Sequence, residues 1–243
     1  MKSNSTAVIF GLAIVLASIF LGNAYVNRNK QNGKIQVTGL GEKDFSSDLI
    51  VWEGSFGVEN KELKIGYAQL ERDKEMIKQY LLSKGVNEDN LVFTAVKTRQ
   101  QSKRNYSIDG KYIGDEFTGF ELKQSILIES NEVDNIEKIS REITELLNKG
   151  VNFYSRSPRY YYTKLADLKI EMISKATEDA RLRAEKIAEF SGGKLGKIVS
   201  AKMGVFQITG QNSNEDYSWG GTFNTSSKEK TASITMKLVY DID

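Results

Sequence analysis

Carboxylates are the side chains of this sequence best suited to acid–base chemistry. The 243 residues include no cysteine and no histidine, which excludes thiolate nucleophiles, disulfides, Ser-His-Asp and Cys-His catalysis, and the commonest zinc ligand. A hydrolase that uses carboxylates alone would need two acids about 5 to 9 Å apart. The candidates are Glu42, Asp44, Asp48 and Glu116. Their spacing does not bring any two of them to a shared site, so we interpret them as solvated loop charges and predict no enzymatic activity.

Metal and cofactor sites need denser ligand patterns than this sequence offers. Calcium requires a run of oxygen ligands such as an EF-hand loop, and Asp241 with Asp243 at the C-terminus is not one. The run Gly39-Leu40-Gly41 lacks the third glycine of a dinucleotide-binding loop and the lysine of a P-loop. It is more typical of a turn between strands. We therefore predict no metal site and no cofactor.

Two stretches combine basic and aromatic side chains, as a surface that binds single-stranded nucleic acid would. The first holds Arg104 and Tyr106, the second holds Arg159 and Tyr160, and their neighbours are Lys97, Arg99, Lys103, Arg156, Tyr161 and Tyr162. Only three of the 34 basic residues lie in residues 1–30, so the remainder has 31 basic against 32 acidic residues. That balance does not favour a polyanion, and we predict no nucleic-acid partner. Contact with anionic lipid or a neighbouring subunit is one interpretation, and tyrosines that bury their rings are the other.

A third candidate surface is the polar segment 210–228. It holds Tyr217, Trp219 and Phe223 among serine, asparagine and glycine residues. Aromatic side chains in a polar loop are typical of recognition surfaces. The alternative is that they fold back to cap a sheet. We expect this loop, with a hairpin tip near Asp109, to supply the subunit contacts of a homo-oligomer.

The N-terminal segment is apolar enough to insert into a membrane. Residues 7–22 carry no charge and approach the length of about 20 residues that spans a bilayer. We predict a retained anchor with Tyr25 at the interface. A signal peptide cleaved after Ala24 is the alternative, because Gly22 and Ala24 are small, and a buried core helix is the third interpretation.

The orientation of this segment depends on two opposing arguments. Arg28 and Lys30 come directly after it, and by the positive-inside rule they would keep the subsequent chain inside the cell. N-terminal apolar segments nevertheless usually export the domain that they precede. We predict a single pass through the bacterial inner membrane with a periplasmic main domain, or secretion to the periplasm if the segment is cleaved.

Hydrophobic periodicity indicates the elements that carry these side chains. Strands are expected at residues 34–38, 48–58, 91–98, 117–129, 195–209 and 230–239, and helices at residues 62–84, 131–149 and 162–193. A turn is expected at Gly39–Glu42, a short strand or loop at 151–154, and a hairpin turn at Asp109-Gly110. In the last strand Ala232, Ile234, Met236 and Leu238 face one way, and in 117–129 the expected set is Leu122, Ser125 and Leu127.

The predicted fold class is α+β, with antiparallel sheets and long amphipathic helices packed on one side. Residues 1–30 form the anchor or signal segment and a linker, and residues 31–243 form the main domain. A helix followed by a strand pair occurs twice, so two β-β-α subdomains with a boundary near 150–160 are a further prediction.

The helix at 162–193 has the most distinctive sequence. Alanines 176, 180 and 184 lie four apart on its apolar stripe, which lets its backbone approach a neighbour closely, and Gly192-Gly193 ends it. The run Ala176–Arg181, followed by Ala184–Ala188 and Gly193–Ile198, resembles the SIMPL family. Bacterial members have an "A..DAR..AE.LA...G..LG.V" signature here.

The resemblance to SIMPL proteins runs from about Ile35 to Val239. It implies an extracytoplasmic α+β protein that tends to oligomerise, has no established catalytic activity and is linked to envelope or oxidative stress. SIMPL members commonly have Pro-Asp where this sequence has Ser47-Asp48. The expected function is non-enzymatic, by self-assembly or binding in the cell envelope. A periplasmic module that binds a small ligand or a client protein is the alternative.

Overall fold

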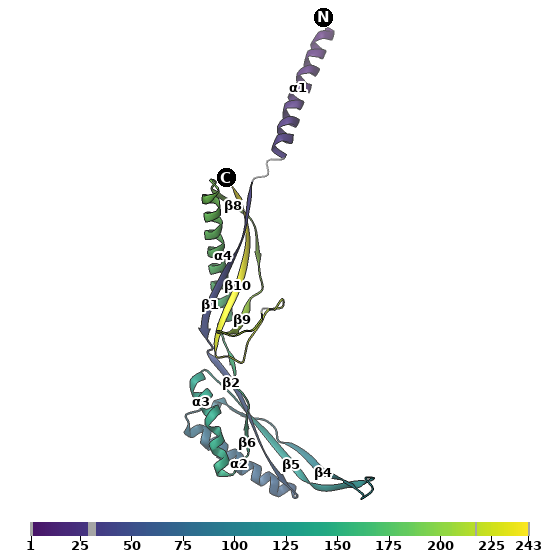
Figure 1. Cartoon of the computed structure of the whole chain (residues 1–243), viewed down its shortest axis with the longest axis vertical. Helices are drawn as coiled ribbons and strands as arrows, with labels where there is room; N and C mark the ends of the chain where they lie inside the picture. Colours follow the sequence, from purple (N-terminus) through teal and green to yellow (C-terminus); the bar gives the residue numbers. More distant parts are fainter. Residues whose placement is uncertain (1, 29–32, 217, 243) are drawn as a thin grey trace. The chain divides into compact units, whose positions relative to one another are not determined.

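The computed structural model describes residues 2–28, 33–216 and 218–242 (Figure 1). Its helices are α1 (Lys2–Arg28), α2 (Leu63–Ser83), α3 (Val133–Glu142) and α4 (Leu165–Phe190), with 3-10 helices η1 (Glu88–Asn90) and η2 (Ile143–Lys149). Its strands are β1 (Lys34–Ser46), β2 (Leu49–Asn60), β3 (Leu91–Phe93), β4 (Lys97–Tyr106), β5 (Tyr112–Ser130), β6 (Phe153–Ser155), β7 (Arg159–Tyr161), β8 (Leu195–Met203), β9 (Gln207–Gly210) and β10 (Glu229–Ile242). The strand pairs are antiparallel, which confirms the predicted α+β class.

The chain divides into two compact units, and each combines segments distant in sequence. The first contains residues 1–41, 173–204 and 234–243, and the second contains residues 42–172 and 205–233. Each unit therefore depends on chain segments that lie far apart in sequence, and local periodicity alone does not specify such a fold.

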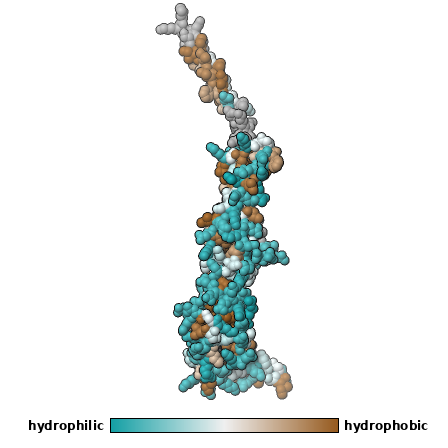
Figure 2. Space-filling view, turned by 90° about the vertical axis from the view of Figure 1, so that its left-hand side faces the viewer, coloured by the Kyte–Doolittle hydropathy of each residue, from teal (hydrophilic) through white to brown (hydrophobic). Residues whose placement is uncertain are grey.

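Helix α1 is exposed along the part whose side chains the structure describes. None of the window Val8–Tyr25 is buried, and Figure 2 shows its hydrophobic side chains. The segment is therefore not a core helix of the described protein. By its length and composition it can cross a bilayer, as expected for a signal anchor or a signal peptide.

Helix α4 covers one face of the sheet in the first unit, whose strand order is β1-β10-β8 (Figure 1). The predicted face of β10 is confirmed, because Ile234, Met236 and Leu238 are all buried. The alanine stripe of α4 is buried as well. Small side chains on the helix and alternating apolar residues on the strands together form this interface.

The turn predicted at Gly39–Glu42 is wrong, because β1 continues unbroken to Ser46. A Cβ atom added to Gly39 would lie 2.1 Å from the carbonyl oxygen of Ala176 and 2.7 Å from the Cβ of Ala180. The glycine therefore serves close packing of a strand against a helix, which a single sequence cannot distinguish from a turn.

The second unit is built on a sheet of order β3-β5-β2-β6, with β4 paired to β5 and β7 paired to β2. Strands β2 and β5 pair from Ile50 opposite Ser130 to Asn60 opposite Phe120. Helices α2 and α3 pack against this pair. The largest fully buried side chains of the resulting core are Trp52, Phe56, Ile50, Leu70, Ile77, Leu81, Leu122, Ile126, Ile128, Ile136 and Ile139.

The expected face of β5 is partly wrong. The buried residues are Leu122, Gln124, Ile126 and Ile128, so Ser125 and Leu127 face the other way. The prediction failed because Gln124 is polar and was therefore not expected on the buried face. It is nevertheless buried, and it donates a hydrogen bond to the carbonyl of Thr94. This bond satisfies the amide NH2 group, whereas the buried Oε1 of Gln124 has no hydrogen-bond partner among the described residues.

Further element boundaries differ from the prediction. The strand expected at 91–98 is divided into β3 and β4, and β4 continues to Tyr106. The helix expected at 131–149 is α-helical only to Glu142 and continues as a 3-10 helix to Lys149, before Gly150 at φ 79°. The strand expected at 195–209 is interrupted at Gly204, where a Cβ atom would lie 2.3 Å from the hydroxyl oxygen of Thr235. Gly204 therefore lies directly against Thr235, and its N–H donates to the Thr235 carbonyl at 2.8 Å.

Candidate interaction surfaces

Three of the four candidate carboxylates form hydrogen bonds with residues of neighbouring segments. Asp44 accepts hydrogen bonds from the Thr231 hydroxyl at 2.6 Å and from the Gln211 amide at 3.0 Å. Asp48 accepts bonds from the backbone N–H and hydroxyl of Thr163 at 2.7 and 2.8 Å. Glu116 accepts one from Asn105, and Glu42 is exposed on β1. These contacts have an evident structural role.

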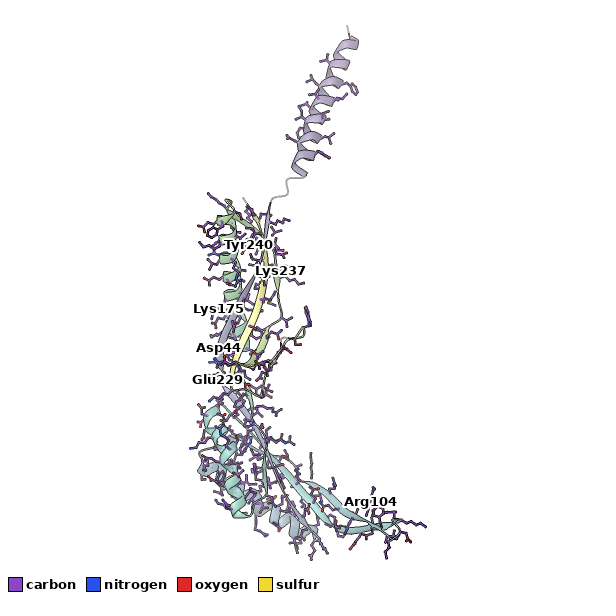
Figure 3. All side chains as sticks on the ribbon, viewed as in Figure 1. Asp44, Arg104, Lys175, Glu229, Lys237 and Tyr240 are labelled. Carbon is purple, nitrogen blue, oxygen red and sulfur yellow. The ribbon has the colours of Figure 1, made fainter. Side chains whose placement is uncertain are left out.

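Arg104 and Tyr106 lie on an arm that strands β4 and β5 form (Figure 3). Arg104 is opposite Asp115, and Tyr106 is opposite Tyr112 with ring centroids 6.0 Å apart. The predicted turn is confirmed by Gly110, which has a φ of 74°. Because acidic residues oppose the basic ones, the arm is not a uniformly cationic surface that would attract anionic lipid.

The second basic stretch separates into an exposed and a buried part. Arg159 is exposed on β7. Tyr160 is only 7% exposed and belongs to the core of the second unit, and its hydroxyl donates a hydrogen bond to Glu137 at 3.1 Å. Burial, together with the charge of Glu137, raises the pKa of Tyr160 to about 12. The ring of Tyr160 is therefore a packing residue, in agreement with the second interpretation of this stretch.

The loop between β9 and β10 presents exposed aromatic rings on a fixed framework. Trp219 is 99% exposed and Phe223 is 51% exposed, whereas Tyr217 lies outside the described residues. Phe223 forms a β-bridge with Ile208. Trp219 thus matches the recognition interpretation, while the attachment of Phe223 to the strand matches the capping interpretation.

A buried lysine forms hydrogen bonds with this loop. Lys230 is 2% exposed, and its Nζ donates to the backbone carbonyl of Asn224 at 2.6 Å and to its side-chain oxygen at 3.3 Å. Burial lowers the pKa of Lys230 to about 8. Asn224 in turn donates to Glu215, which accepts the N–H of Gly210 at 3.0 Å. The loop is therefore part of the fold.

Sequence reasoning missed the role of Lys230, although a signal was present. Lys230 lies two residues before Ala232, so it shares the buried face of β10. A charged residue at a position where the alternation predicts an apolar one indicates a buried charge that is hydrogen-bonded inside the protein. Removal of residues 211–226 would take away the partner of this lysine, so substitution of Trp219 is the sharper test of the loop's surface.

Strand β8 is an edge strand with exposed side chains on both faces. It pairs with β10 on one side, where Leu238 is opposite Ala201 and Tyr240 is opposite Ile198. No strand among the described residues pairs with its other side. Ile198 is 53% exposed, Val199 47% and Met203 55%. An exposed apolar edge of this kind is a template for pairing with another chain.

The opposite edge of this sheet is partly closed. The backbone N–H of Leu40 on β1 donates to the Asp179 carboxylate of α4 at 2.8 Å, and Arg183 donates to the same carboxylate at 2.9 Å. The hydrogen bond from Leu40 lowers the pKa of Asp179, and the hydrogen bond from Arg183 lowers it further by a smaller amount. A side chain of α4 therefore accepts a hydrogen bond from a backbone N–H of β1. Among the described residues, no side chain or strand does the same for the free edge of β8.

Comparison with known proteins supports the resemblance noted in the sequence. No curated protein is matched to the chain. The family model described as SIMPL, a protein of unknown function (DUF541), matches residues 35–240. This range begins at the first strand and ends in the last one, and thus covers both units. The chain therefore belongs to the SIMPL family.

Proposed function

We propose that this SIMPL protein is a non-enzymatic component of the bacterial cell envelope that acts by self-assembly through β8. Helix α1 anchors it in the inner membrane, and the main domain lies in the periplasm. The observation that carries the proposal is the exposed, apolar edge of β8, which no strand in the described part of the chain covers. Backbone donors and acceptors on such an edge are satisfied when a second strand joins it.

The charge pattern of β8 permits two copies to pair with each other. Its lysines, Lys197 and Lys202, lie near its ends and leave the uncharged centre Ile198–Ala201 between them. In an antiparallel pair centred on Ser200, Lys202 would lie opposite Ile198 and Lys197 opposite Met203. The lysines would not oppose each other, and the contact would be twofold symmetric, the commonest symmetry of homo-oligomers.

A long edge strand of the other sheet, β4, is protected against such pairing. It has four basic residues along ten positions, Lys97, Arg99, Lys103 and Arg104. Basic side chains on an edge are a common device against edge-to-edge association. The contrast between the charged β4 and the uncharged centre of β8 favours β8 as the assembly edge.

A single introduced cysteine tests the proposal. The chain has no cysteine, so Ser200→Cys would be its one thiol. Opposed residues of an antiparallel pair have Cα atoms about 4.5–5.5 Å apart, within the range of about 4.4–6.8 Å that a disulfide spans. We expect mild oxidation of membranes that contain full-length Ser200→Cys to give a covalent dimer.

The matched control is Thr235→Cys, because Thr235 is exposed but lies on the central strand β10. This variant should stay monomeric under the same oxidation. Cysteines at Val199 and Ala201 would locate the symmetry axis if it is displaced by one residue. A monomer at all three β8 positions, or equal dimer formation by the control, would rule out the β8 pairing.

A further inference from the structure

A cavity of about 440 Å³ lies in the second unit, beside the end of β2. Residues of α2, β2 and β5 line it, together with the connection between η2 and β6. Its volume lies within the range of about 300–1,000 Å³ that is typical of small-molecule sites. None of the candidate surfaces discussed above includes this cavity.

The cavity contains a buried carboxylate that no part of the described structure pairs with. Asp73 lines it and is only 6% exposed. It lies on the buried face of α2, three residues after Leu70 and four before Ile77. No described residue forms a hydrogen bond or ion pair with its carboxylate. Burial raises the pKa of Asp73, and the nearby charge of Arg72 offsets this only in part. A buried carboxylate is normally paired, so this one is suited to a cationic group from outside the chain.

The backbone at this end of β2 is also incompletely paired. Strand β6 pairs with β2 only from Gly54 to Phe56, whereas β2 continues to Asn60. Gly57, Val58 and Glu59 line the cavity and have no described strand on that side. Polar backbone groups are thus available next to Asp73, and a ligand with both apolar and polar parts would satisfy them.

The ionisable side chains that line the cavity favour a cation. Asp73, Glu59 and Glu121 are acidic, and Lys123 is the single basic residue among them. Among the residues that the structure describes, no group of three or more acidic side chains is arranged to hold a metal ion. An organic cation fits these facts better, because it needs one carboxylate as counter-ion and apolar contact for its carbon chain.

We propose that this cavity binds a primary alkylammonium group, with Asp73 as its counter-ion. The ammonium has three N–H donors and no acceptor, which matches the carboxylate of Asp73 and the side-chain carbonyl of Gln69. The alkyl chain contacts Val58 and the ring of Tyr154, and Glu59 and Glu121 add negative charge. A free diamine and a lysine side chain of an extended peptide share this chemistry.

The test is calorimetric titration of the full chain in detergent with cadaverine, a diamine whose length resembles a lysine side chain. A capped Gly-Lys-Gly peptide distinguishes the second source, and 1-pentanol is the uncharged control. We expect saturable binding of cadaverine or of the peptide, and none of pentanol. Binding of one but not the other identifies the source, whereas absence of both or equal binding of pentanol overturns the proposal.

Asp73→Asn assigns the binding to this cavity. The substitution keeps the side-chain volume and removes a buried charge, so the variant should fold. We expect its affinity for the bound amine to fall at least tenfold. Asp89→Asn, at an exposed position outside the cavity, should bind as the unchanged protein does. Equal affinity of Asp73→Asn and the unchanged protein would overturn the assignment.

Discussion

Gly39→Ala is expected to lower the free energy of unfolding of the main domain by about 3 kcal/mol or more. The added Cβ would lie 2.1 Å from the carbonyl oxygen of Ala176 and 2.4 Å from the backbone nitrogen of Ala180. Both atoms belong to the backbone of α4, so no side chain can rotate away. The strand and the helix must separate instead, which opens the interface that the alanine stripe closes.

Chemical denaturation of residues 31–243, followed by circular dichroism, measures this effect. The control is Gly220→Ala, because the nearest atom to a Cβ at Gly220 is 3.9 Å away. The control should change the stability by less than about 0.5 kcal/mol. Equal unfolding midpoints for the two variants would show that β1 and α4 are not in this close contact.

The chain's two tryptophans should respond very differently to replacement by alanine. Trp52 is fully buried, its ring lies 6.0 Å from that of Phe153, and its Nε1 donates to the Ser155 hydroxyl at 3.0 Å. Trp52→Ala leaves a large cavity and removes this bond, and should cost about 3–5 kcal/mol. Trp219 is 99% exposed, so Trp219→Ala should stay within about 0.5 kcal/mol of the unchanged protein.

Tryptophan fluorescence provides an independent measurement for the same pair. In Trp219→Ala the remaining emission comes from Trp52, and it should be blue-shifted because that ring is buried. In Trp52→Ala the emission should be red-shifted, as for a ring in water. Similar spectra, or a similar loss of stability, would contradict the placement of the two rings.

The sequence predicts most helices and strands, because their side-chain periodicity reports burial directly. The helix 62–84 and the strand 48–58 both appear with boundaries within two residues. The predictions that failed concern residues whose role depends on a distant partner. Gly39 packs on α4, and Gly204 packs on Thr235. A single sequence shows the glycine but not the distant group that requires it.

The candidate surfaces could be predicted only in part. An aromatic ring in a polar loop predicted the exposure of Trp219, but the same reasoning could not separate it from Tyr160, which is buried because β7 pairs with β2. The edge position of β8 results from the strand order β1-β10-β8, which local pattern does not encode. Asp73 and Lys230 did leave a local signal, since each places a charge on an otherwise apolar stripe.

The solution mass of residues 31–243 tests self-assembly through β8 most directly. Light scattering over a concentration series should give at least twice the monomer mass, and Ile198→Lys should reduce it to the monomer, because a charge in the centre of the edge opposes pairing. Leu182→Lys is the control, since Leu182 on α4 is 54% exposed against 53% for Ile198. A strict monomer at every concentration, or an Ile198→Lys variant with the same mass as the unchanged domain, would contradict the proposal.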